Sequence, residues 1–205
     1  MDRCAEMEAY IQEYRDQRIM LKREKLEKEC NYYTESLKKQ VGSLIEKQVF
    51  RQQEKAQGAV KYIMFCNLLT SGYTHSYEIA LGLADARLYL DEKLNWIYWR
   101  PEYVYTEMDQ ALKEMTRLLS KKFIRIEQYE LFYLQRKLLM DDWELFIEYL
   151  FKISDELLER IIESSLLLEQ GLEILYGGYM EEPKTAYQVV IKEREGHKWE
   201  KVRSI

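Results

Sequence analysis

The sequence predicts a mainly α-helical protein with a long N-terminal helical arm, a helical body and a small antiparallel β element around residues 75–99. Three observations predict this class: the 205-residue chain has only 2 prolines and 8 glycines, it is rich in good helix formers, and most of its apolar residues recur at helical spacing. At 47% apolar residues, the chain is long enough to bury one core. We divide it into the arm (residues 1–57), a helical body with a short β insertion (58–182) and a C-terminal strand or charged tail (183–205).

The arm is predicted from residues 3–57, which contain no proline and Gly42 as their one glycine. Its apolar residues repeat at intervals of four and three, which is typical of a coiled coil, but residues 22–29 contain Leu26 alone. We therefore expect a partly coiled-coil-like arm that projects, or packs only at its two ends. The residues that carry the repeat are Met7, Ile11, Tyr14, Cys30, Tyr33, Leu37, Val41 and Leu44.

The body is expected to open with a second apolar helical face. This face comprises Ala56, Val60, Ile63, Met64 and Leu68, and the Ser71-Gly72 pair ends it. From Tyr77 to Leu83 apolar and small or polar residues then alternate, which is typical of a half-buried strand. A helix from Ser76 to Leu90 fits the same residues, so both readings stay open.

The aromatic stretch NWIYWRPEYVY (residues 95–105) is expected to form a corner. Pro101 fixes its own φ and pushes Arg100 toward extended geometry, so the chain leaves a strand near Trp99 and enters a helix near Thr106. The aromatic residues then fill the gap between sheet and helix, and a recognition surface that includes Trp99 and Arg100 is the alternative.

Three further helices are predicted beyond the corner. The first, residues 106–119, begins with a capping-box pattern at Thr106 and Asp109; the second spans about 125–151; the third starts at Ser154 and ends at Gly177-Gly178. A strand is expected after Pro183. The predicted core residues are Trp143, Phe146, Leu150, Ile161 and Leu168.

The sequence argues against catalysis, cofactors and metals. Glutamates recur on adjacent predicted helices, but His75 and His197 are the only histidines, so the Glu-x-x-His pairs of a di-iron bundle cannot form. No G-x-S-x-G elbow or phosphate-binding glycine loop is present, and the 3 cysteines are scattered. We read His75, with Glu78 three residues on, as a turn residue. The sequence thus favours a non-enzymatic protein without cofactor or metal.

The location expected from the sequence is cytoplasmic. The N-terminus mixes charges of both signs and lacks the apolar core of a signal peptide, and no apolar run approaches the roughly 20 residues that span a membrane.

Charge is distributed unevenly along the chain. Residues 15–61 hold 12 Lys or Arg against 7 Asp or Glu, a local charge of +5, whereas residues 127–173 hold 4 against 12, a local charge of −8. The basic cluster on the arm makes a nucleic-acid-binding regulator the alternative function. Interleaved glutamates at intrahelical spacing weigh against it.

The leading functional hypothesis is a protein–protein interaction or adaptor protein, an accessory or inhibitory component beside a larger effector. It would bind a protein partner or a second copy of itself, through an arm that can be deleted up to residue 29 without loss of the fold. The expected contact residues are Met7, Ile11, Tyr14, Ile19, Met20, Lys22, Arg23, Lys25, Lys28, Trp99 and Arg100.

Overall fold

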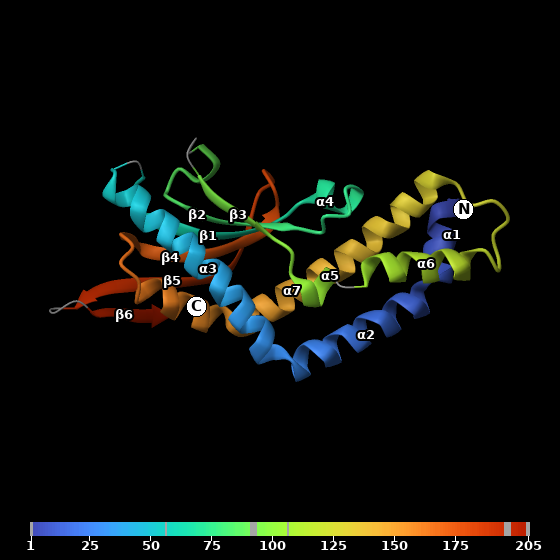
Figure 1. Cartoon of the computed structure of the whole chain (residues 1–205), viewed down its shortest axis with the longest axis horizontal. Helices are drawn as coiled ribbons and strands as arrows, with labels where there is room; N and C mark the ends of the chain where they lie inside the picture. Colours follow the sequence, from blue (N-terminus) through green and yellow to red (C-terminus); the bar gives the residue numbers. More distant parts are fainter. Residues whose placement is uncertain (1, 56, 91–93, 106, 195–197, 204–205) are drawn as a thin grey trace.

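The computed structural model describes residues 2–55, 57–90, 94–105, 107–194 and 198–203. The helices are α1 (Arg3–Tyr10), α2 (Gln12–Lys28), α3 (Cys30–Gln53), α4 (Leu69–Tyr73), the 3-10 turn η1 (Leu88–Leu90), α5 (Glu102–Tyr105), α6 (Met108–Leu119) and α7 (Gln128–Ile162). The strands are β1 (Val60–Asn67), β2 (Ile79–Ala84), β3 (Asn95–Trp99), β4 (Leu168–Gly178), β5 (Lys184–Arg194) and β6 (Lys198–Arg203). Helices α1 to α3 come first along the described chain and strands β4 to β6 come last, with helices and strands mixed between them (Figure 1).

The strands of the described residues form one mixed six-stranded sheet in the order β3-β2-β1-β4-β5-β6. Strands β1 and β4 are parallel, with Ile63 opposite Ile174, and the other neighbouring pairs are antiparallel. The prediction of a mainly α protein with a small β element is therefore wrong. The chain has an α/β fold with a substantial sheet.

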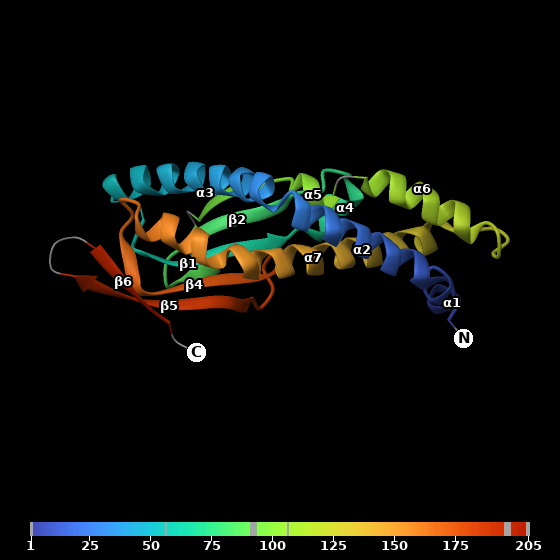
Figure 2. The same ribbon diagram turned by 90° about the horizontal axis from the view of Figure 1, so that it is seen from below.

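Helices α3 and α7 lie against the same face of this sheet: α3 crosses the strands in Figure 1, and α7 runs in front of them in Figure 2. Their apolar side chains and the inward residues of the strands form one continuous core. Helix α7 has 35 residues, so at about 1.5 Å per residue it is roughly 50 Å long. Its first half extends beyond the sheet, where α1, α2 and α6 accompany it (Figure 1).

Two segments predicted as helices are central strands. Residues 60–67 form β1, and residues 168–178 form β4, although the leucines at 168, 172 and 175 carry a helical spacing. A short apolar run fits both the helical period and the strand period, and the segment that it pairs with in the fold determines which structure it forms. Here β1 and β4 hydrogen-bond to each other across more than 100 residues of sequence, a pairing that no local pattern reveals.

The helix expected to start at Ser154 does not start there. Helix α7 continues through this position because the buried Ser154 hydroxyl donates a hydrogen bond of 2.7 Å to the carbonyl of Leu150. A serine bonded in this way is satisfied inside a helix and has no need to act as an N-cap.

Other expectations are confirmed. Helix α6 and strand β5 lie where the sequence placed a helix and a strand. In the segment 75–99, where a strand and a helix both fitted the sequence, the structure has strands β2 and β3 with the 3-10 turn η1 between them. Trp143, Phe146, Leu150 and Ile161 are buried, whereas Leu168 is half-buried at the start of β4. The N-cap expected at Thr106 lies outside the described residues.

The arm of residues 1–57 is not one straight helix. It bends at Ile11 and Glu29, which have φ of −96° and −109° and separate α1, α2 and α3. These bends turn α1 and α2 along the first half of α7 and lay α3 across the sheet (Figure 2). The arm is thus part of the packed structure.

Candidate functional site

The apolar contact residues proposed on the arm face the interior of the molecule. Met7 and Ile11 are fully buried in the core cluster, where they fill the space beside α7 instead of forming an exposed contact. The Tyr14 hydroxyl donates a hydrogen bond of 3.1 Å to the Ala111 carbonyl in α6. Ile19 is half-buried, and Met20 is exposed.

Charged residues of α1 and α2 pair with residues of opposite charge on α7. We call this series of contacts the arm–α7 ion-pair row. It comprises Arg3–Glu130 at 2.9 Å, Lys137–Glu8 at 3.1 Å, Arg15–Asp141 at 2.7 Å, Arg18–Asp142 at 2.5 Å, Lys22–Asp142 at 2.9 Å, Arg23–Glu148 at 2.9 Å and Lys152–Glu27 at 3.6 Å. The opposite charges seen in the sequence therefore meet within one chain.

The centre of this row is buried. Asp142 accepts hydrogen bonds from both Arg18 and Lys22, and burial lowers the pKa of Lys22 to about 8 against the opposing attraction of Asp142. The single buried carboxylate offsets one of the two positive charges, so the loss of Asp142 would leave both cations without a counter-charge.

The remaining proposed contact residues are scattered. Lys25 and Lys28 are exposed at the end of α2, and Lys25 lies 3.9 Å from Glu107. Trp99 is buried in the core, whereas Arg100 is exposed and lies over the ring of Tyr77 at 5.4 Å from its centroid. The structure thus does not bring the proposed residues together in one surface.

A polar cluster near Arg100 joins His75, Tyr77 and Asp109. The Tyr77 hydroxyl donates to Asp109 at 2.7 Å, and His75 Nδ1 lies 2.8 Å from Tyr77 Oη and 3.0 Å from Asp109 Oδ1. The hydrogen bond from Tyr77 lowers the pKa of Asp109, and His75 adds to this effect. The carboxylate partner of His75 is therefore Asp109 and not Glu78.

The backbone of this cluster is strained. His75 and Tyr77 both have positive φ, at 57° and 51°, a region that side chains other than glycine rarely occupy. The Tyr77 N–H donates to the Ser71 carbonyl at 3.2 Å, and its ring stacks against Tyr105 at 6.1 Å. These contacts hold the strained turn in place.

The sheet face opposite α3 and α7 carries a group of aromatic side chains that we call the aromatic layer. It consists of Tyr62, Tyr89, Trp96, Tyr98 and Tyr179. Trp96 and Tyr89 each pack edge-to-face against Tyr179, with ring centroids 5.8 and 6.4 Å apart. Gly82 lets Trp96 lie directly on β2, since a Cβ there would come within 2.4 Å of the indole.

The aromatic layer is open to solvent over part of its area. The small cluster beneath it consists of Met64, Cys66, Ala80, Ala84 and Leu175. Among the described residues, everything that packs on this cluster comes from strands, loops or the turn η1, so no α-helix covers it. Tyr98 is 58% exposed and Tyr179 is 42% exposed. The stretch 95–105, for which a recognition surface was the alternative to a corner, contributes Trp96 and Tyr98 to this face. The sequence did not indicate that Tyr62, Tyr89 and Tyr179 join them.

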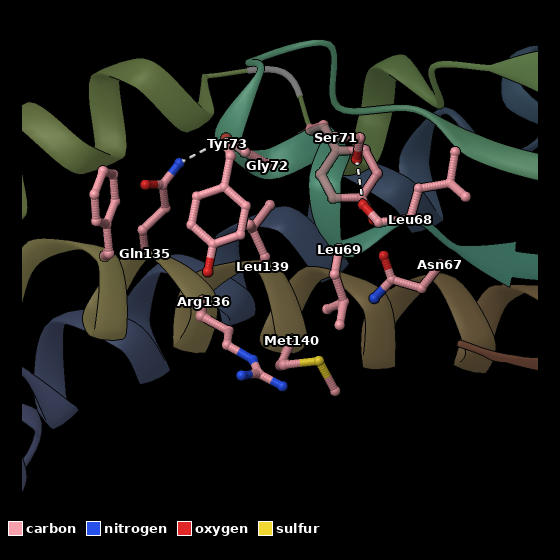
Figure 3. Close-up of a pocket in the computed structure, with 12 residues that line it drawn as sticks. Asn67, Leu68, Leu69, Ser71, Gly72, Tyr73, Gln135, Arg136, Leu139 and Met140 are labelled. Carbon is pink, nitrogen blue, oxygen red and sulfur yellow. Dashed lines mark hydrogen bonds between the residues drawn. The ribbon is translucent and has the colours of Figure 1, made fainter. Parts of the chain in front are cut away.

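A pocket lies between α4 and the first half of α7, and we call it the elbow pocket. Its volume is about 70 Å³. Figure 3 shows Leu68, Leu69 and Tyr73 on one side and Arg136, Leu139 and Met140 from α7 on the other. The amide of Gln135 donates to the Gly72 carbonyl at 3.0 Å and ties α4 to α7 beside the pocket.

Comparison with models of known protein families, with curated proteins and with solved structures found no match to this chain. The fold and surfaces define it as an α/β protein with helices on one sheet face and an aromatic layer on the other. In the described part of the chain, no helix is long and apolar enough to cross a membrane. The same residues contain no group of three or more His, Cys, Asp or Glu side chains placed to hold a metal ion.

The sequence carried a signal for the aromatic layer. The alternation from Ala80 to Ala84 and from Trp96 to Tyr98 places small residues and aromatic residues on the same sheet face. Aromatic residues beside small residues on one face of a sheet indicate a surface that is left open or packed by rings. The elbow pocket had no such signal, because its walls come from segments about 60 residues apart.

Proposed function

We propose that this protein is a non-enzymatic interaction protein that docks a protein partner through the aromatic layer on the open face of its sheet. The observation that supports the proposal is a cluster of five aromatic side chains, on a face without a covering helix in the described residues, with Tyr98 and Tyr179 substantially exposed. Tyrosine and tryptophan are enriched at the centres of protein interfaces, where they bury a large apolar area and keep a polar group for hydrogen bonding.

The surroundings of the layer suit such a contact. Lys61 lies over the ring of Tyr62 at 5.0 Å, and Glu173 is the residue opposite Tyr62 on β4. An apolar centre with charged residues around it is the usual arrangement of a protein interface. The partner-binding surface that we propose is therefore on the sheet, whereas the sequence suggested the arm.

The alternative of nucleic-acid binding loses its main support. Arg15, Arg18, Lys22 and Arg23 all take part in the arm–α7 ion-pair row. A phosphate backbone would have to replace carboxylates that already neutralise these side chains, so the free energy gained from each phosphate contact would be small.

Photo-crosslinking in the cells that make the protein tests this proposal. A photoreactive phenylalanine derivative replaces Tyr98 in one variant and Tyr32 in a matched control, because Tyr32 on α3 is 66% exposed but lies away from the aromatic layer. We expect a discrete crosslinked species from position 98 that is absent from position 32. A product of twice the chain mass identifies the partner as a second copy.

The double variant Tyr98→Asp/Tyr179→Asp provides the second arm of the test. In this variant the photoreactive residue is placed at position 96. The two introduced carboxylates should prevent partner binding, so we expect the crosslinked species to disappear. The circular dichroism spectrum should remain that of the folded protein. Equal crosslinking from positions 98 and 32, or none from position 98, contradicts the proposal.

A further inference from the structure

We propose that the elbow pocket binds a small monocarboxylate with a short apolar tail. The site is separate from the proposed docking face, because none of the five residues of the aromatic layer lines it. It lies where the end of β1, helix α4 and the first half of α7 meet (Figure 3).

The walls of the pocket are fixed by close packing. Gly72 allows α4 to approach α7, since a Cβ at this position would come within 2.4 Å of the Leu139 side chain. The hydrogen bond from Gln135 to the Gly72 carbonyl and the edge-to-face pair of Tyr73 and Phe132, at 5.6 Å, hold the two helices together. A pocket with such walls is formed before a ligand arrives.

Asn67 supplies a polar side chain at the end of β1. This residue is 9% exposed, it lines the pocket, and no hydrogen bond joins its side-chain amide to another of the described residues. An amide that lines a pocket can donate a hydrogen bond to a ligand oxygen.

Arg136 supplies a free positive charge at the same place. It lines the pocket, is exposed, and has no ion-pair partner among the described residues, whereas the adjacent Lys137 pairs with Glu8 at 3.1 Å. Figure 3 shows Met140 between Arg136 and Asn67. A guanidinium group recognises carboxylates through two parallel hydrogen bonds, so Arg136 selects an anionic head group.

The rest of the lining selects the tail. Leu69, Tyr73, Phe132 and Met140 are partly exposed apolar side chains around the pocket, and Leu68, Tyr105 and Leu139 complete it. A volume of about 70 Å³ is several times what one water molecule requires and about half of an engineered cavity that holds benzene. A tail of a few carbons fits this space, and a long acyl chain does not.

Titration calorimetry with butyrate tests the site on the full-length chain. We expect butyrate to bind with a Kd of about 1 mM or below, and butanol, butylamine and acetate to bind at least about tenfold more weakly, because each lacks either the charge or the tail. With methyl-labelled methionine, the NMR signal of Met140 should move on addition of butyrate while that of the exposed Met20 stays in place.

Variants separate recognition from folding. Arg136→Gln should weaken butyrate binding by at least about tenfold, and Asn67→Asp should do so by placing a carboxylate against the ligand. Arg117→Gln, which removes an exposed charge from α6 away from the pocket, is the matched control and should bind like the wild type. Arg136 is at the surface, so its variant remains informative if Asn67→Asp does not fold.

Three results would overturn the inference. These are equal affinity for butyrate and butanol, equal weakening by Arg117→Gln and Arg136→Gln, or a Met140 signal that does not respond to butyrate. A water-filled pocket with a purely structural role gives the last of these.

Discussion

The ion pairs of the arm–α7 ion-pair row contribute differently to the free energy of unfolding. A buried pair contributes more than an exposed one. Asp142 is fully buried and accepts hydrogen bonds from Arg18 and Lys22, whereas the Arg23–Glu148 pair is about half exposed on both sides. Water screens an exposed ion pair, so it contributes little to stability. A buried carboxylate that is removed leaves its cations without compensation.

The variant Asp142→Ala should therefore lower the free energy of unfolding by about 3–5 kcal/mol. Glu148→Ala removes a carboxylate from the same helix and should change it by less than about 1 kcal/mol. Urea unfolding at neutral pH measures both values. Similar losses in the two variants would show that the Asp142 cluster is not the energetic centre of the row.

The hydrogen bond from Tyr77 to Asp109 makes a contribution to the free energy of unfolding that depends on pH. The bond lowers the pKa of Asp109 below its usual 3.8, so the folded state favours the carboxylate form. The contribution is present above the unfolded-state pKa and is lost as pH falls through the folded-state pKa. The facing charged groups, His75 and Arg100, are present in wild type and variant alike.

We expect Tyr77→Phe to destabilise the protein at neutral pH and to destabilise it less once the pH is below about 3.8. Denaturant unfolding of both proteins at a series of pH values between about 2 and 7 measures the difference. A difference that stays constant over this range contradicts the role given to Asp109.

At the scale of elements, the arm shows how one sequence pattern allows two arrangements. Its interrupted apolar repeat suits an arm that projects, and it equally suits helices that pack at intervals along a neighbour. The structure has the second arrangement: Met7, Ile11 and Leu26 are buried on α1 and α2, and the polar residues between them pair with α7.

Deletion of residues 1–29 tests this arrangement. It removes three buried side chains, each contributing about 1.5–3 kcal/mol, and it leaves Asp142 without Arg18 and Lys22. We therefore expect the melting temperature to fall by at least about 10 °C, in contrast to the unchanged value that the sequence suggested. Thermal unfolding followed by circular dichroism measures it, and an unchanged melting temperature would show that the arm is not part of the core.

At the scale of the whole molecule, α7 joins the sheet end to the helical end. The same helix carries Leu134 and Leu138 in its first half and Leu157 and Ile161 near its end, and all four belong to one core cluster. A core that is continuous along one helix couples both ends of the molecule, because unfolding either end exposes part of the same helix.

The chain should accordingly unfold in one cooperative transition. In a Cys4→Ser/Cys30→Ser background, the reactivity of the buried Cys66 thiol in β1 reports on the sheet, and far-UV circular dichroism reports mainly on the helices. We expect both to give the same urea midpoint. Labelling of Cys66 at a lower urea concentration than the loss of helix would reveal two independent units.

Several features of the molecule could be predicted from local sequence alone. The amphipathic pattern of residues 108–119 predicts α6, the run of apolar residues from Leu134 to Leu150 predicts a central helix, and the alternation after Pro183 predicts β5. These elements were predictable because one face of each is buried, so apolar residues recur along its local sequence with the period of a helix or a strand. The acidic and basic segments were equally visible in the sequence.

The tertiary structure alone decided which segments pair. Strands β1 and β4 read as helix because their apolar residues fit both periods, and only their parallel pairing in the centre of the sheet selects the extended form. The partner of the basic arm is α7 of the same chain, since the bends at Ile11 and Glu29 return α1 and α2 to it. The aromatic layer and the elbow pocket likewise arise from residues distant in sequence, because contacts of this kind form only when the chain closes on itself.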